Sequence, residues 1–312
     1  MKRAVLAALV LLIFPATARA DGPPVGQWAI GGVRSAGERY VALPSRHGTM
    51  LERLTLKGAA PVRFHFLPRL VGVPMVAIDG TPGGLSRDGR TLVLSQPRTR
   101  YPESTSRLYL VNARTLRLRR VITLRGDFSF DAISPDGRTL YLIQLSRRSF
   151  TRYAVRALDT STGRLFPRPV VDATEPDEVM RGMPYARVTS PDGRYSYTLY
   201  AGGEKPFIHA LDTVRRKAAC IDLPPLSLNA QLSLRLRGRT LAVLADEAPA
   251  AFVNVPTRHV WRPAAPRPAA RQPAGDGGGS GPWPLLGALG ALALAAGLTA
   301  AGRKRRAGAA RS

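Results

Sequence analysis

SPDGRTLYL at residues 134–142 recurs as SRDGRTLVL at 86–94 and as SPDGRYSYT at 190–198. Two weaker copies flank these three, SAGERYVAL at 35–43 and a segment around Arg237 to Leu241. Intervals of 51, 48, 56 and 45 residues separate the equivalent positions, which are Glu38, Gly89, Gly137, Gly193 and Gly238. A period of this length is typical of a repeated unit of four short β-strands. The chain is therefore expected to be an all-β repeat protein.

The repeated motif has the residues of a tight turn between two strands. Pro135 and Pro191 fix φ, the aspartate side chain can hydrogen-bond the turn backbone, and the following glycine supplies a positive φ. The alternating residues after the glycine then enter a strand. Each copy therefore predicts a hairpin.

A second, looser similarity follows each motif. It comprises LYLVNARTLRL from Leu108, YAVRALDTSTGRL from Tyr153, FIHALDTVRR from Phe207 and FVNVPTRHV from Phe252. Each segment predicts a third strand, a turn of Asn, Asp, Thr or Gly, and a fourth strand. Every unit thus offers about four short strands.

In its S-P-D-G-R-x-L-Y motif and its "ALDT" turn the chain resembles the YVTN and WD40-like β-propellers, a broad group that includes TolB-type and lactonase-type domains. The resemblance covers roughly residues 25–262 and implies a propeller. Dividing residues 21–262 among repeats of about 48 residues predicts five blades, with six as the alternative. Residues 27–33 are expected to form the first inner strand, and the last unit has a short outer strand near residues 259–262.

Both ends of the chain have the patterns of membrane targeting. Residues 1–20 combine a basic start, an apolar run and an Ala-x-Ala site, which predicts a cleaved signal peptide. Residues 283–302 carry no charge and are long enough for a transmembrane helix, and the basic residues 303–312 are expected to stay in the cytoplasm. Residues 263–282 predict a disordered Pro/Gly-rich linker. The domain at 21–262 is therefore expected outside a cell membrane that the chain crosses once.

The predicted exported part is strongly basic. Of 46 Lys and Arg, three lie in the signal and five in the tail, which leaves 38 against 21 Asp and Glu, or +17. Such a charge favours an anionic partner, such as a phosphate-bearing wall polymer or lipid headgroups. A merely solvated surface with a mutational arginine bias is the alternative. Nucleic acid is not expected for an exported domain without a nucleic-acid motif.

The sequence has no local catalytic or metal motif. The histidines at positions 47, 65, 209 and 259 are isolated, and Cys220 is the only cysteine, so neither a metal site, a cofactor nor an intrachain disulfide is predicted.

The resemblance implies that inner strands line a central channel. Gly83, Asp131 and Arg187 stand three residues before successive motif serines, and with Asp79 and Tyr185 they are the predicted polar mouth of that channel. The alternative is that these side chains only solvate the channel or pair with one another.

Two charged clusters lie elsewhere. Asp172, Glu175, Asp177 and Glu178 form an acidic loop whose carboxylates could take Ca²⁺, and a solvated insertion is the alternative. A run of arginines on and beside the second outer strand either protects a sheet edge or lines a groove for an anionic polymer; it comprises Arg114, Arg117, Arg119, Arg120 and Arg125.

Three functions are compatible with these features. The first is a binding or scaffold module for an envelope protein or an anionic cell-wall component. The alternative is an extracytoplasmic propeller enzyme of the lactonase or lyase type, which the resemblance permits but no local motif supports. A membrane-bound accessory subunit is the third, and its short predicted tail would need a partner helix.

Overall fold

The computed structural model describes residues 28–35, 37–176, 180–203 and 205–264, and these residues form strands, turns and loops without a helix. They make five antiparallel sheets, which follow one another along the chain. The described part contains no apolar helix long enough to cross a membrane. The predicted signal peptide, the transmembrane segment at 283–302 and the basic tail lie outside the described residues, as does nearly all of the predicted linker.

The strands have the following bounds. The first sheet contains β1 Val33–Ser35, β2 Glu38–Ser45, β3 Gly48–Thr55 and β4 Pro61–Leu67. The second contains β5 Thr91–Ser95, β6 Thr105–Asn112 and β7 Leu118–Arg125. The third contains β8 Phe128–Ile133, β9 Thr139–Ser146, β10 Ser149–Asp159 and β11 Arg164–Val170, with β12 Met180–Arg181 paired to β10. The fourth contains β13 Met183–Thr189, β14 Tyr195–Ala201, β15 Phe207–Asp212 and β16 Lys217–Asp222. The fifth contains β17 Leu232–Arg237, β18 Thr240–Ala245, β19 Ala248–Asn254 and β20 His259–Trp261.

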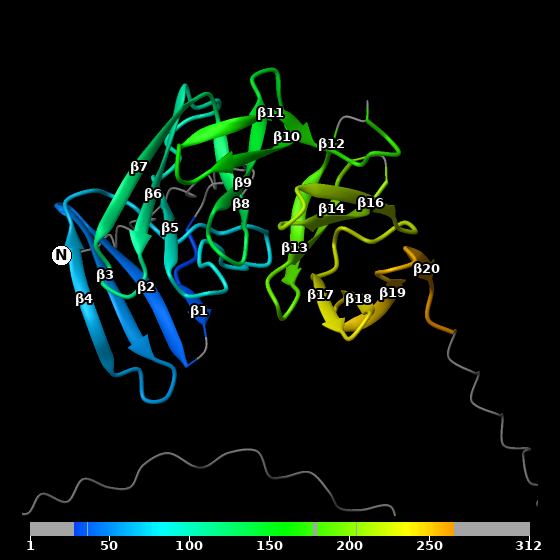
Figure 1. Ribbon diagram of the computed structural model, residues 1–312. Helices are drawn as coiled ribbons and strands as arrows, with labels where there is room; N and C mark the ends of the chain where they lie inside the picture. Colours follow the sequence, from blue (N-terminus) through cyan, green and yellow to red (C-terminus); the bar gives the residue numbers. More distant parts are fainter. Residues whose placement is uncertain (1–27, 36, 177–179, 204, 265–312) are drawn as a thin grey trace, which may run out of the picture. The chain divides into compact units, whose positions relative to one another are not determined.

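Within each sheet, hydrogen-bonded neighbours are consecutive in the chain. Figure 1 shows the first strand of each sheet toward the middle of the domain and the last strand toward its periphery. Consecutive meanders arranged around a common centre make a propeller-type fold, which confirms the fold class that the repeats predict. The predicted third and fourth strands of the last four units are also present, as β6–β7, β10–β11, β15–β16 and β19–β20.

The motif turns have the hydrogen bonds that their sequence predicts. In the third sheet, Ser134 Oγ donates to Asp136 Oδ1 (2.6 Å), which also accepts a bond from the main-chain N–H of Arg138 (3.0 Å). The Ser134 hydroxyl accepts from the N–H of Thr139 (2.9 Å), and Gly137 has a φ of 72°. The same serine–aspartate contact occurs at Ser86 and Ser190. The serine and aspartate side chains therefore stabilise these three turns through hydrogen bonds within the turn itself.

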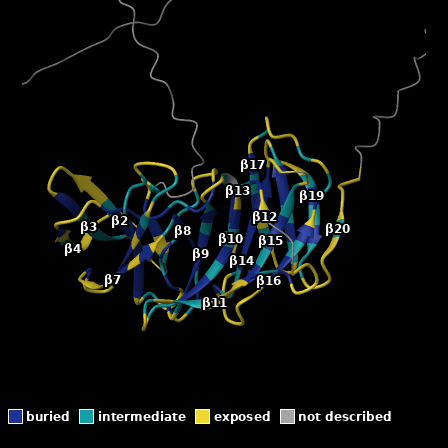
Figure 2. Ribbon diagram, turned by 90° about the horizontal axis from the view of Figure 1, so that it is seen from above, coloured by how far each residue is buried: buried dark blue, intermediate teal, exposed yellow. Residues whose placement is uncertain are grey.

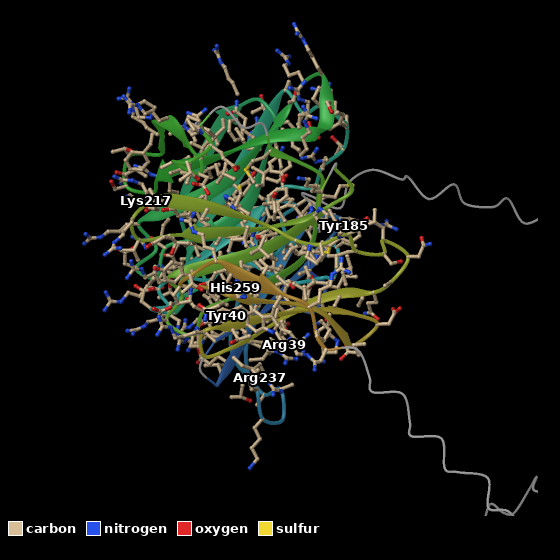
Figure 3. The ribbon with its side chains drawn as sticks, turned by 90° about the vertical axis from the view of Figure 1, so that its right-hand side faces the viewer. Arg39, Tyr40, Tyr185, Lys217, Arg237 and His259 are labelled. Carbon is tan, nitrogen blue, oxygen red and sulfur yellow. The ribbon has the colours of Figure 1, made fainter. Side chains whose placement is uncertain are left out.

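A second hydrogen bond joins each motif turn to the turn before the last strand of its sheet. In the third sheet, Thr160 N–H donates to the carbonyl of Arg138 (2.9 Å). The equivalent bonds run from Leu56 to Gly37, from Ala113 to Arg90, from Thr213 to Arg194 and from Val255 to Arg239. Both kinds of turn therefore lie at the same end of the strands in every sheet, which we call the motif-turn end. Figure 3 shows Lys217, which follows one of these turns, on the opposite side of the domain from Tyr185.

Two inner strands differ from the expected pattern. Only Val33 of the predicted strand 27–33 lies in β1, because Gly32 forms a turn whose N–H bonds the carbonyl of Ala29 (3.0 Å). The second sheet has no regular innermost strand, and residues 72–85 make only isolated bridges, including Met75 to Pro82 and Leu85 to Leu92. Pro74 and Pro82 cannot donate main-chain hydrogen bonds, which prevents a continuous ladder there.

The core lies between the faces of neighbouring sheets. One apolar cluster joins the second and third sheets through residues such as Leu110, Phe130 and Leu142, and others join the third to the fourth and the fourth to the fifth. Figure 2 shows the buried residues along the strands and the exposed ones in the turns and outer strands. The turns at the motif-turn end contain exposed residues and can therefore present polar side chains to solvent.

Candidate functional site

A hairpin from the second sheet contacts the innermost strand of the fourth. Residues 75–82 fold back through the Met75–Pro82 bridge, with Val76 N–H bonded to the carbonyl of Thr81 (2.9 Å). The tip then pairs with the start of β13, where Ile78 N–H donates to the carbonyl of Pro184 (2.8 Å) and Asp79 N–H to that of Tyr185 (3.0 Å). The prolines and glycines that interrupt the strand therefore bring this hairpin against a distant sheet.

The hairpin brings Asp79 of the predicted channel mouth to Tyr185 and Arg187, and Arg187 in turn contacts Asp131. Asp79 Oδ1 accepts hydrogen bonds from the N–H and hydroxyl of Thr81, and its Oδ2 accepts one from the N–H of Arg187 (3.3 Å). Arg187 Nη1 donates to the carbonyl of Asp131 (2.6 Å), and Nη2 donates to the Asp131 carboxylate. Tyr185 offers its carbonyl to the hairpin, while its ring packs against the apolar cluster of the fourth and fifth sheets. Asp131 and Arg187 are paired with each other, which was the alternative interpretation.

A pocket of about 300 Å³ lies beside this ion pair. Buried residues of its wall include Phe130, Asp131, Arg187 and Ser196, while Arg34 and Arg87 are exposed. Gly83 also lines it, and a Cβ there would lie 2.6 Å from the Phe130 ring, so this position needs glycine for packing. We call this cavity the channel pocket, since the first, second, third and fourth sheets all contribute to it.

Arg34 and Arg87 were not predicted from the sequence. Arg87 Nε donates to the carbonyl of Pro191 (2.7 Å), which holds the guanidinium against the motif turn of the fourth sheet. A Cβ on Gly193 would lie 2.9 Å from the Arg87 side chain, so the contact is close. A signal for Arg87 exists in the sequence, because it occupies the motif position that is proline in the third and fourth copies.

The charges around the channel pocket are unequal. Asp131 neutralises Arg187, and the side chains of this pair are 2% and 4% exposed. Among the described residues, no carboxylate lies within 4.0 Å of the guanidinium of Arg34 or Arg87. Guanidinium groups bind carboxylate and phosphate through paired hydrogen bonds. The pocket therefore has the charge and the donors to bind an anionic group.

His209 lies near the pocket but does not line it. It continues a cross-strand row in which Arg187 pairs with Thr198, Thr198 with His209, and His209 with Cys220. The His209 side chain is buried, and neither ring nitrogen has a hydrogen-bond partner in the described part of the chain. Burial lowers its pKa to about 4, so the ring is neutral at pH 7. This histidine is not placed to act on a molecule in the pocket.

The acidic loop has a structural role at its first residue. Asp172 is buried, and its carboxylate accepts hydrogen bonds from Thr174 N–H (2.9 Å), the Thr174 hydroxyl (2.8 Å) and Cys220 N–H (2.9 Å). Arg258 Nη1 lies 3.6 Å away. Glu175 is exposed, and Asp177 and Glu178 lie outside the described residues. Among the residues the structure describes, no group of three potential metal ligands gathers in one place.

Comparison with known proteins gives only distant structural likeness. No protein-family model and no curated protein matches this chain. Among solved structures, hydrazine synthase of Kuenenia stuttgartiensis is 16% identical, with a TM-score of 0.44 over 73% of this chain and 69% of that one. BamB of Moraxella catarrhalis is 17% identical, with a TM-score of 0.38 over 73% and 66%. The Cps50 (Swd1) β-propeller domain of Myceliophteria thermophila is 13% identical, with a TM-score of 0.42 over 70% and 62%. These likenesses assign no ligand or activity to this chain.

Proposed function

We propose that this protein is a binding module outside a cell membrane, whose channel pocket holds an anionic group of an envelope protein or a cell-wall polymer. The observation that carries the proposal is the placement of Arg34, Arg87 and Arg187 around one pocket, where, among the residues that the structure describes, only Arg187 has a carboxylate partner. Because two guanidiniums keep their charge, a ligand with one or two negative charges gains charge-assisted hydrogen bonds there.

The location rests on the ends of the sequence. The basic and apolar start of the chain has the pattern of an export signal, and the uncharged segment 283–302 followed by basic residues has the pattern of an anchor with a cytoplasmic tail. In this proposal the five sheets are five blades of a propeller, and the Pro/Gly-rich stretch 263–282 separates it from the membrane.

A lactonase- or lyase-type enzyme is the competing function. Such an enzyme needs an acid or base facing its substrate. In the channel pocket the one carboxylate among the lining residues, that of Asp131, is bonded to Arg187, and the nearby His209 is buried behind Thr198. The arrangement therefore favours binding over turnover.

Calorimetric titration of the full-length protein in detergent with inorganic phosphate and with citrate tests this proposal. We expect binding at low ionic strength and a loss of about tenfold or more in affinity for the double variant Arg34→Gln/Arg87→Gln. The matched control is Arg147→Gln/Arg148→Gln, which removes the same charge from the exposed β9–β10 turn. Equal losses in both variants, or no binding by the wild type, would contradict an anion site in the channel pocket.

A further inference from the structure

A second pocket lies between the second and third sheets, at the motif-turn end of their strands. It has a volume of about 450 Å³, and its lining includes four arginines, namely Arg90, Arg119, Arg120 and Arg138. Arg90 and Arg138 belong to the motif turns of the second and third sheets, while Arg119 and Arg120 belong to β7. We call this cavity the inter-sheet pocket.

The strand register places Arg120 at the opening between the two sheets. Arg120 on β7 is directly opposite Leu110 on β6, so both side chains lie on the same face of the second sheet. Leu110 packs in the apolar cluster that contains Leu140 and Leu142 of the third sheet. Arg120 Nη1 would lie 3.3 Å from a Cβ on Gly163, which places its guanidinium beside the turn after β10. The position of this arginine is therefore set by both sheets.

The inter-sheet pocket keeps an excess of positive charge. Asp88 and Asp136 line it too, but each is bonded to the serine and main chain of its own motif turn. Their second oxygens lie 3.9 Å from Arg90 and 3.7 Å from Arg138. Across the described ranges, no carboxylate comes within 4.0 Å of the guanidinium of Arg119 or Arg120. Two of the four arginines are thus available to an anion.

One short turn lines both pockets. Arg87 faces the channel pocket, and the next residue, Asp88, together with Arg90, lines the inter-sheet pocket. The turn is held against its neighbour by a hydrogen bond from Asp88 N–H to the carbonyl of Pro135 (3.0 Å). A Cβ on Gly137 would lie 2.7 Å from Thr91 Oγ1, so the two turns are in close contact. The two basic sites are therefore adjacent parts of one surface.

We infer that the ligand is a linear polymer with repeated phosphate groups, of which one occupies the channel pocket and another the inter-sheet pocket. This inference rests on the proposed function and names the class of its ligand. A single small anion would use only one of two adjacent sites, whereas a polymer gains from both because the second contact is intramolecular. Guanidinium groups suit phosphate through their paired donors. None of the described residues that line the inter-sheet pocket is aromatic, so they give no platform for stacking nucleic-acid bases.

Inorganic polyphosphate of defined length is the probe, compared with inorganic phosphate on the full-length protein. We expect the Arg119→Gln/Arg120→Gln variant to bind polyphosphate of about twenty units about tenfold more weakly than the wild type, because it removes two ion pairs between an arginine and a phosphate of the ligand. Its affinity for inorganic phosphate in the channel pocket should stay within about twofold. The Arg147→Gln/Arg148→Gln control should keep its polyphosphate affinity within about threefold, because its charges lie away from both pockets.

The outcomes separate this inference from the proposed function. Polyphosphate affinity that falls in Arg34→Gln/Arg87→Gln but is unchanged in Arg119→Gln/Arg120→Gln overturns the two-pocket ligand and leaves the channel site intact. Equal losses in the control variant overturn it as well, since they indicate unspecific attraction to a basic protein. A single-stranded oligonucleotide that binds more tightly than polyphosphate, with the same dependence on Arg119 and Arg120, would also overturn the inference. The ligand would then be a nucleic acid. If every variant binds inorganic phosphate as the wild type does, this result contradicts the proposed function itself.

Discussion

Arg187 and Asp131 form a buried ion pair that joins the innermost strands of the fourth and third sheets. The guanidinium donates both to the Asp131 carboxylate and to its main-chain carbonyl, so the pair fixes the backbone as well as the charge. Its position at the wall of the channel pocket makes it the structural support of the site.

We expect Arg187→Met to lower the free energy of unfolding by about 3–5 kcal/mol, because it leaves the Asp131 carboxylate buried without its partner. Urea unfolding followed by fluorescence measures this loss. The double variant Arg187→Met/Asp131→Leu should recover most of it, since replacing both partners by apolar residues removes the uncompensated charge. A double variant as unstable as the single one would show that the pair is not the cause.

His209 should make the stability depend on pH below neutrality. Burial lowers its pKa from the ordinary 6.5 to about 4, so between these values the unfolded chain binds a proton that the folded chain does not. The contribution of neutral His209 is complete above pH 6.5 and is lost as the pH falls toward 4. We expect it to reduce the free energy of unfolding by about 2 kcal/mol between pH 7 and pH 4.5.

Urea unfolding at these two pH values, on the wild type and on His209→Gln, checks this prediction. The variant has no titrating group at this position and should lose less stability over the same interval. An identical pH dependence in both proteins would rule out His209 as its source.

Asp172 should stabilise the protein without any cation. Although burial acts to raise it, hydrogen bonds from Thr174 and Cys220 hold the pKa of Asp172 below its ordinary value. We expect Asp172→Ala to cost about 1–3 kcal/mol of unfolding free energy, since it removes the buried carboxylate that accepts from the N–H groups of Thr174 and Cys220. The exposed Glu175→Ala is the control and should change stability by less than about 0.5 kcal/mol. A midpoint of unfolding that rises with Ca²⁺ and loses this rise in Asp172→Ala would instead support the cation site.

Asp79 should hold the 75–82 hairpin in place. Its carboxylate bonds Thr81 within the hairpin and the N–H of Arg187 in β13. In Asp79→Ala we expect the main-chain amides at positions 78 and 79 to exchange with deuterium about tenfold faster than in the wild type. This corresponds to about 1.4 kcal/mol of lost local stability. The amides of β18 in the fifth sheet are the internal reference. Faster exchange there too would indicate a global effect.

The repeats made the fold predictable because each motif contains the groups that close its own turn. Ser134 and Asp136 need no distant residue to form their hydrogen bonds, so local sequence determines where β9 begins. The same local logic failed at residues 72–85, where prolines replaced a regular ladder by isolated bridges.

The candidate site was predictable only in part. Asp131 and Arg187 occupy equivalent positions of successive repeats, and in the structure the Arg187 guanidinium donates to the Asp131 carboxylate. Arg34 and Arg87 lie on turns, so their approach to the channel pocket depends on how neighbouring sheets pack. The contact between Arg87 and Pro191 crosses 104 residues of chain, and no local pattern carries information of that range.

Nearly all strand pairing in this protein joins consecutive segments, so a chain made from its N-terminus can complete one sheet before the next is synthesised. The hairpin at 75–82 is an exception, since Thr81 meets Arg187 across 106 residues. It must wait until the fourth sheet exists. The wall of the channel pocket is therefore among the last parts to assemble, and a nascent chain completes this pocket only after most of the domain is already folded.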